Sequence, residues 1–332
     1  MSQAPIQFAR DVSSKANDAW LSGEYLENVT PTTKQLLTYW FDERYCENRG
    51  LNFHEGQRQA ILNTIYLHEV LKTRNIFEAY ERIAPDLLLR SEGGLAEISK
   101  TKYSHPKYAI KMATGTGKTW VLSAMLIWQY LNAKHEEGNY SKNFLIVAPG
   151  LIVYERLLDA FLGKEREGAD GRDFESSDIF RSQDLFLPES YREEIFGFFK
   201  SSVVVKEEIG NKVTGDGLIA VTNWHLLAGV SEESPVETES PGDLDPVGIL
   251  KSMLPTRPSA SAGNDLNVLV NAYGQGKELG YLRDLPDLMA FNDEAHHLAT
   301  NAQEEKQWQK SLSHIAETKG EHFMQVDFSA TP

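Results

Sequence analysis

Short apolar runs alternate with longer amphipathic stretches from residue 107 onward. The stretch Thr119–Lys134 places Val121, Met125 and Trp128 at helical spacing. Apolar runs of strand length that alternate with helices are typical of a mostly parallel sheet covered by helices on both faces. We therefore predict an α/β fold for this part of the chain. The runs that predict strands are Lys107–Met112, Asn143–Ala148, Val203–Val205, Leu218–Thr222, Leu288–Asn292 and Met324–Phe328.

The first part of the chain has a different pattern, because residues 15–100 are mostly helical in character. Within them, Gln57–Leu71 places Ile61 and Ile65 near one helical face, with polar residues between. A proline and a glycine pair predict a break within residues 84–99. We expect the chain to begin with a helical extension, which leads into the α/β part.

Composition limits the kinds of partner that the chain can hold. The net charge is −15, from 33 Lys and Arg against 48 Asp and Glu. Phosphate backbones are held by clustered basic side chains, so this balance opposes a general electrostatic grip on nucleic acid. Any contact with DNA or RNA must come from a local patch or from polypeptide outside this sequence.

One segment of the α/β part stands apart, because residues 228–265 are rich in acidic residues, proline, serine and glycine. Ser231–Asp245 contains acidic residues and no basic ones. Such a composition is typical of a solvated, mobile insertion. An acidic regulatory or DNA-mimicking arm is the alternative interpretation.

The sequence favours a cytoplasmic protein that does not contact the membrane. Cys46 is the only cysteine, and one thiol cannot build a disulfide framework or a zinc-finger type of metal site. The longest apolar stretches are far shorter than the ~20 residues that a membrane span needs.

A glycine-rich segment, Met112–Thr119 (MATGTGKT), follows a predicted strand and opens a predicted helix. Glycines let the backbone turn its N–H groups toward phosphate oxygens, and the start of a helix adds partial positive charge. A lysine can then reach the β- and γ-phosphates, and a threonine hydroxyl can ligate Mg²⁺. A plain glycine-rich turn is the alternative. The residues predicted to bind the nucleotide are Thr114, Gly115, Thr116, Gly117, Lys118 and Thr119.

Acidic and hydroxyl residues follow two of the later predicted strands. Asp293 and Glu294 come directly after Leu288–Asn292, and Ser329-Ala330-Thr331 follows Met324–Phe328. Ligands of open α/β sheets lie beyond the carboxyl ends of the strands. We therefore expect Asp293 to hold Mg²⁺ and Glu294 to polarise the attacking water. An acidic helix start and a simple turn are the alternatives for these two segments.

The order ATGTGKT, NDEAHHL and FSATP resembles motifs I, II and III of superfamily 2 helicases. The double histidine after the acidic pair, and the methionine before ATGTGKT, are most similar to the Res-type branch, which includes the type III restriction motor subunits. Val147–Ile152 resembles motif Ia. The resemblance implies a RecA-like P-loop domain over residues 51–332, preceded by the helical extension over residues 1–50.

The resemblance also implies roles for individual residues. Lys118, Asp293 and Glu294 would be catalytic, and Thr119 and Asp293 would hold the metal. Gln57, in FHEGQRQAI, resembles the adenine-reading glutamine; a polar residue on an amphipathic helix is an equal alternative. The residues that would couple the ATP site to nucleic acid are His296, Ser329 and Thr331. For His296, a structural role at a helix start is the alternative.

The implied activity is ATP- and Mg²⁺-dependent translocation on double-stranded DNA, in a restriction or other phage-defence enzyme. A methyltransferase subunit is a candidate partner. In such motors a second RecA-like domain supplies an arginine finger, and neither that domain nor a nuclease is recognisable in this sequence. We therefore expect weak nucleotide binding and slow hydrolysis by this chain alone. An RNA helicase and a nucleotide-gated binding module remain alternatives, whereas the second and third motifs argue against a metabolic P-loop kinase.

Overall fold

The computed structural model describes the chain over residues 4–90, 104–113, 115–166, 168, 171–223, 278–293 and 302–329. Of the regions predicted above, the acidic insertion at 228–265 and the glycine pair at 93–94 lie outside the described residues.

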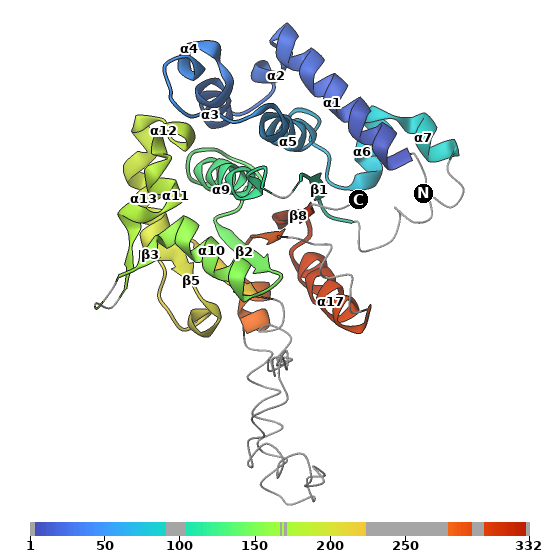
Figure 1. The fold of residues 1–332 in the computed structure, drawn as a ribbon. Helices are drawn as coiled ribbons and strands as arrows, with labels where there is room; N and C mark the ends of the chain where they lie inside the picture. The colour runs from blue at the N-terminus through green and yellow to red at the C-terminus, as the bar shows by residue number, and fades with distance from the viewer. Residues whose placement is uncertain are drawn as a thin grey trace, which may run out of the picture.

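The centre of the molecule is a parallel sheet of six strands in the order β1-β8-β7-β2-β6-β5 (Figure 1). Strands β2, β6 and β7 are buried along their whole length, as expected for strands covered on both faces. The predicted α/β fold is confirmed. The strands are β1 (Lys107–Lys111), β2 (Asn143–Ala148), β5 (Val203–Val204), β6 (Leu218–Asn223), β7 (Leu288–Asn292) and β8 (Phe323–Ser329).

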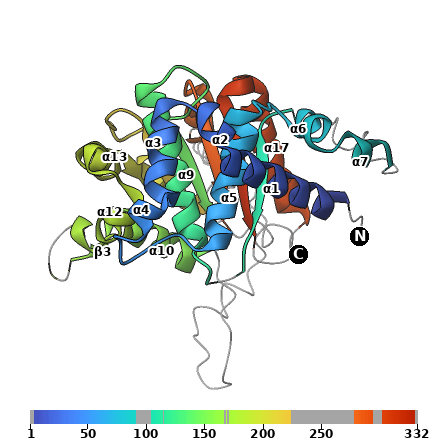
Figure 2. The ribbon, with the colours of Figure 1, turned by 90° about the horizontal axis from the view of Figure 1, so that it is seen from above.

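One face of the sheet is covered by α9 (Lys118–His135), and a further layer of helices lies over α9 (Figures 1 and 2). Both α3 and α5 contact α9, and α1 contacts α5. Residues 121–132 of α9 are all buried, because the helix is enclosed by the sheet on one side and by this layer on the other. The outer helices are α1 (Ala4–Ser22), α2 (Glu24–Glu27), α3 (Pro31–Phe41), α4 (Glu43–Cys46), α5 (Glu55–Ile65), α6 (Ile76–Ile83) and α7 (Pro85–Arg90).

The first helices therefore belong to the main core. Phe8, Val12, Leu36 and Trp40 are buried in the same apolar cluster as α9 and the sheet face beneath it. The predicted amphipathic helix at 57–71 forms α5 and continues as a short π-helix, Tyr66–Val70. A helix break occurs at Ala84, as the sequence predicts, since α6 ends before it and α7 begins after it.

The opposite face of the sheet packs against α17 (Ala302–Lys319) and residues 279–285. Leu312, Ile315 and Ala316 of α17 are buried there against Leu145 of β2 and Ala290 of β7. Within the described part of the chain, no helix has both the length and the apolar character needed to cross a membrane.

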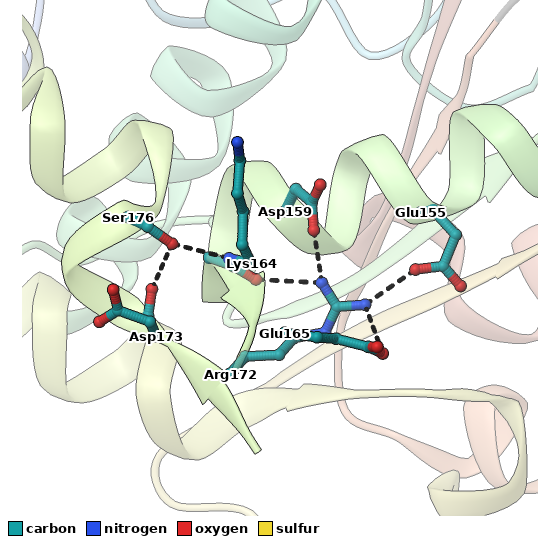
Figure 3. A network of polar contacts seen from close by, with 8 residues as sticks. Glu155, Asp159, Lys164, Glu165, Arg172, Asp173 and Ser176 are labelled. Carbon is teal, nitrogen blue, oxygen red and sulfur yellow. Dashed lines mark hydrogen bonds and ion pairs between the residues drawn. The ribbon is translucent and has the colours of Figure 1, made fainter. Parts of the chain in front are cut away.

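Several short elements follow β2 and cover the β5 end of the sheet. Among them, the β3–β4 hairpin is antiparallel and is held against α10 by Arg172 (Figure 3). The guanidinium donates to Asp159 at 2.6 Å, Glu155 at 2.8 Å and the carbonyl of Gly163 at 3.0 Å. These elements are α10 (Leu151–Leu162), β3 (Lys164–Glu165), β4 (Arg172–Asp173), α11 (Asp178–Arg181), α12 (Gln183–Phe186) and α13 (Arg192–Ser202), with 3-10 turns at Phe174–Ser176, Glu189–Tyr191 and Lys206–Glu208. A further 3-10 turn, Gly320–His322, connects α17 to β8.

Candidate functional site

The glycine-rich segment connects β1 to α9, as predicted. Met112 donates its backbone N–H to the carbonyl of Ser329 at 2.9 Å, so the end of β1 is bonded to the end of β8. Gly115 and Gly117 have φ values of +81° and +75°. Only glycine adopts this left-handed region without strain, which explains why both positions carry it.

The start of α9 has the geometry of an anion site. Gly117 is its N-cap, and a glycine has no side chain that could cap the helix. Lys118 and Thr119, the first two helical residues, are half-buried. A helix that begins without a side-chain cap presents backbone N–H groups and partial positive charge to an anion. Thr114 lies outside the described residues.

Asp293 lies directly after β7, at the same edge of the sheet as the start of α9. Only β8 separates β7 from β1. Two strand spacings correspond to about 10 Å, a distance that a polyphosphate and a metal ion span. Asp293 is buried, and its backbone N–H donates to the carbonyl of Val147 at 3.0 Å, which fixes the residue at the strand end.

A polar network supports this edge from the α17 side of the sheet. Asp327 of β8 accepts hydrogen bonds from Asn292 at 2.6 Å and Gln325 at 2.8 Å, and its other oxygen lies 3.5 Å from the ammonium of Lys107. The network links β1, β8 and β7, the three strands that carry the motifs. It therefore fixes the strand that ends at Asp293 relative to the strand that ends at the glycine-rich loop.

The other predicted site residues divide into two groups. Ser329 is at the end of β8, and its carbonyl binds the N–H that opens the glycine-rich loop. Glu294, His296 and Thr331 lie outside the described residues. Their roles stay predictions from the motifs.

Gln57 is buried and lies against the glycine-rich loop. Its amide nitrogen donates to the carbonyls of Thr116 at 3.2 Å and Gly117 at 3.3 Å. Its amide oxygen accepts from the backbone N–H of His54 at 3.0 Å. These hydrogen bonds use both the nitrogen and the oxygen of the amide, so some of them would have to break before the side chain could bind an adenine. The adenine-reading role stays a prediction.

His54 is a site residue that sequence reasoning missed. Its Nε2 lies 2.8 Å from the carbonyl of Thr116, and its Nδ1 lies 3.4 Å from the backbone N–H of Gln57. His54 is therefore the N-cap of α5, in a capping box with Gln57. Ser, Thr, Asp or Asn three residues before a Glu or Gln is the usual sequence signal for this arrangement, and histidine at the cap hides it.

The donor set fits a magnesium nucleotide. The Thr119 hydroxyl and the Asp293 carboxylate are the hard oxygen ligands that Mg²⁺ takes in proteins, alongside phosphate oxygens. Gly115 is exposed, and a Cβ there would meet no atom of the described residues within 4 Å, so they leave this side of the loop open. Bound there, the metal would offset the charge of the phosphates.

A large hollow among the described residues lies elsewhere. It has a volume of about 770 Å³ and lies between α1, α5, α6 and β1. Phe8, Val12, Leu67 and Tyr80 contribute to a mostly apolar lining. Such a surface does not suit a polyphosphate, so we do not assign the nucleotide to this hollow.

Comparison with known proteins agrees with the motifs. Residues 51–205 match the family described as type III restriction enzyme, res subunit. The match contains Gln57 and the glycine-rich loop, whereas Asp293 and Ser329 lie beyond it. Comparison of the chain with curated proteins and with solved structures gives no match. Residues 51–205 are thus similar to the type III restriction enzyme Res subunit family, a match that indicates a helicase-type ATP-binding domain.

Proposed function

We propose that the protein is the ATP-binding part of an ATP-dependent DNA translocase of restriction type. One observation carries the proposal: the glycine-rich loop and Asp293 lie at the same edge of the sheet, with one strand between theirs. The phosphates of ATP bind the loop and Lys118. Thr119 and Asp293 hold Mg²⁺.

Hydrolysis requires a base beside the γ-phosphate. Glu294 follows Asp293 in the sequence, so it belongs at the same edge of the sheet. Its carboxylate polarises the water that attacks the γ-phosphorus, and the proton moves from this water to the carboxylate. The bond from the γ-phosphorus to the bridging oxygen breaks, and that oxygen leaves with ADP. A second RecA-like domain completes the site with an arginine.

Nucleic acid binds near the start of α10, on the segment that resembles motif Ia. Leu151 and Ile152 are 52% and 81% exposed there, so their side chains are available for contact. The net charge of −15 requires such local contact in place of a broad basic surface. Double-stranded DNA is the proposed substrate because the family match is to a restriction subunit.

Nucleotide binding is tested first, by calorimetric titration of the chain with Mg·ATP and Mg·ADP. We expect Lys118→Ala to weaken binding by about 100-fold, because it removes the cation that contacts the phosphates. Lys134→Ala is the matched control: it removes a lysine from the other end of α9, where it pairs with Asp216, and it should leave affinity within about twofold. Equal affinities for the wild type and Lys118→Ala would overturn the proposal.

The substrate and the base are tested on the protein together with its second motor domain. ATP turnover should rise with double-stranded DNA and stay low with RNA. Glu294→Gln should retain nucleotide binding and lose turnover by at least about 100-fold. Turnover that responds to RNA alone would make the protein an RNA helicase. A Glu294→Gln variant as active as the wild type would remove Glu294 from the mechanism.

A further inference from the structure

Two carbonyl groups of the glycine-rich loop are held from outside by residues at the start of α5. The carbonyl of Thr116 lies 2.8 Å from Nε2 of His54 and accepts from Gln57 at 3.2 Å. The carbonyl of Gly117 accepts from Gln57 at 3.3 Å. We infer that His54 is a positioning residue, which orients the phosphate-binding amides of this loop. The inference rests on the proposed function and adds a residue that the motifs do not contain.

The tautomer of His54 follows from its two contacts. The backbone N–H of Gln57 points at Nδ1, so Nδ1 carries a lone pair and the ring proton is on Nε2. Nε2–H therefore donates to the Thr116 carbonyl. One imidazole thus links the first turn of α5 to the loop, and the neutral form makes both bonds at once.

Planarity of the peptide bond turns these carbonyl contacts into control of the amides. The carbonyl of residue 116 and the N–H of residue 117 lie in one plane and point in opposite directions. A donor that holds the Thr116 carbonyl toward α5 therefore turns the Gly117 N–H away from α5. The bond from Gln57 to the Gly117 carbonyl does the same for the N–H of Lys118. Amides oriented before the ligand arrives bind phosphate without the cost of ordering the loop.

His54 and Gln57 do not act independently. The His54 backbone N–H donates to the Gln57 side-chain oxygen at 3.0 Å, which aims the nitrogen of that amide at the loop. The Gln57 amide also lies where a Cβ at residue 117 would be, so the glycine allows the close approach. His54 is therefore connected to the loop twice, through its ring and through Gln57.

The design of the test separates this role from simple helix capping. Asparagine at position 54 can still cap α5, because its side-chain oxygen can accept from Gln57 N–H, but it is too short to replace the imidazole at the Thr116 carbonyl. His54→Ala removes both contacts. Asn75→Ala is the matched control, since Asn75 caps α6 by accepting from the N–H of Glu78 at 2.9 Å, in another helix.

Two readouts are measured on the whole chain: affinity for Mg·ADP and Mg·GDP, and hydrogen exchange of the loop amides. We expect His54→Asn to keep the melting temperature and to weaken both nucleotides by about fivefold, the equivalent of one hydrogen bond. The loss is equal for the two bases because the loop binds only the diphosphate that they share. Exchange should quicken at Thr116 and Trp120, whose N–H groups are bonded within the loop, and not along α5.

The exchange measurement needs no nucleotide, so it decides the inference even if the proposed function fails. Faster loop exchange in His54→Asn, with normal exchange in Asn75→Ala, supports the positioning role. Loop exchange in His54→Asn that matches the wild type overturns it. Faster exchange along α5 with a lowered melting temperature would assign His54 to capping alone, and would also overturn it.

Discussion

The two ends of α9 are both held by the segment formed by α5 and the π-helix that follows it, yet they differ in what remains open. At the first end, His54 and Gln57 bind loop carbonyls and leave the other side of the loop exposed. Toward the far end, Glu69 accepts from Trp128 at 2.6 Å, from the Thr33 hydroxyl at 2.6 Å and from the backbone N–H of Thr30 at 3.0 Å.

This difference assigns the Glu69 network to stability and the contacts to the loop to ligand binding. The Glu69 network is buried, and its donors and acceptors bind one another. Burial raises the pKa of Glu69, and the hydrogen bond from Thr33 opposes that rise. A polar cluster whose donors and acceptors satisfy one another in this way stabilises the fold. A cluster that holds one side of a loop, and leaves the other side open, prepares a binding site.

The largest expected effect is a loss of stability when the Glu69 network is broken. Glu69→Ala removes the acceptor of the donors on Thr33 and Thr30 and one of the two acceptors of Trp128, so we expect the free energy of unfolding to fall by about 3 kcal/mol. Urea denaturation measures it. Glu69→Gln keeps the volume and one acceptor oxygen and should lose about half as much. Nucleotide affinity of the folded variants should stay at the wild-type value; a parallel loss of affinity would mean that the two ends are not independent.

The loop end of α9 could be predicted from the sequence more completely than the Glu69 network toward its far end. Glycines and a lysine between a strand and a helix specify phosphate binding locally, and Asp293 follows from the rule that parallel strands end at one edge. Glu69, Thr33 and Trp128 come together only after distant helices have packed, and no spacing in the sequence indicates it. His54 lies between these cases: its capping box is local, but its bond to Thr116 depends on how α5 meets the loop.

The amino end of the sheet offers a test by pH. His105 precedes β1, is buried, and packs edge-to-face on Phe323 with ring centroids 4.8 Å apart. Burial, and then the charge of Lys107, lower the pKa of His105 to about 4. The unfolded chain protonates this histidine near its ordinary pKa, so the folded state loses stability as pH falls from about 6.5 toward 4, by up to about 3 kcal/mol.

Urea midpoints recorded between pH 7 and 4.5 measure this slope. His105→Gln removes this titrating group and should make the profile shallower over the same range, while His68, whose pKa burial also lowers to about 4, keeps part of the slope. A wild-type profile as flat as that of His105→Gln would show that His105 is equally easy to protonate in the folded and unfolded states. Stability should change along this profile without any step in nucleotide affinity that follows His105, because the site lies at the other end of the strands.

A smaller effect is expected when a methyl group is added to the glycine-rich loop. Gly117→Ala requires a left-handed alanine at φ +75° and brings its Cβ into the Gln57 amide. We expect nucleotide affinity to fall by about tenfold and stability by about 1–2 kcal/mol. Gly115→Ala is the control for backbone strain, with φ +81° and no atom of the described residues within 4 Å of the added Cβ. If both variants lose the same stability, contact with Gln57 does not shape the loop.

The smallest expected effect tests whether burial, rather than the number of hydrogen bonds, determines how much a polar network stabilises the fold. Arg172 makes four polar contacts, more than the three that Glu69 accepts from Thr30, Thr33 and Trp128. Its carboxylate partners are exposed, however: the side chains of Glu155, Asp159 and Glu165 are 57%, 46% and 80% accessible. Water can replace the guanidinium at each of them, so we expect Arg172→Ala to cost only about 1 kcal/mol in urea denaturation. Arg172→Lys keeps the charge but loses the planar fork, and should recover less than half of that loss. If Arg172→Ala lowers the free energy of unfolding as much as Glu69→Ala does, the number of hydrogen bonds determines the loss. The exposure of the partners to water would then not explain the difference between the two networks.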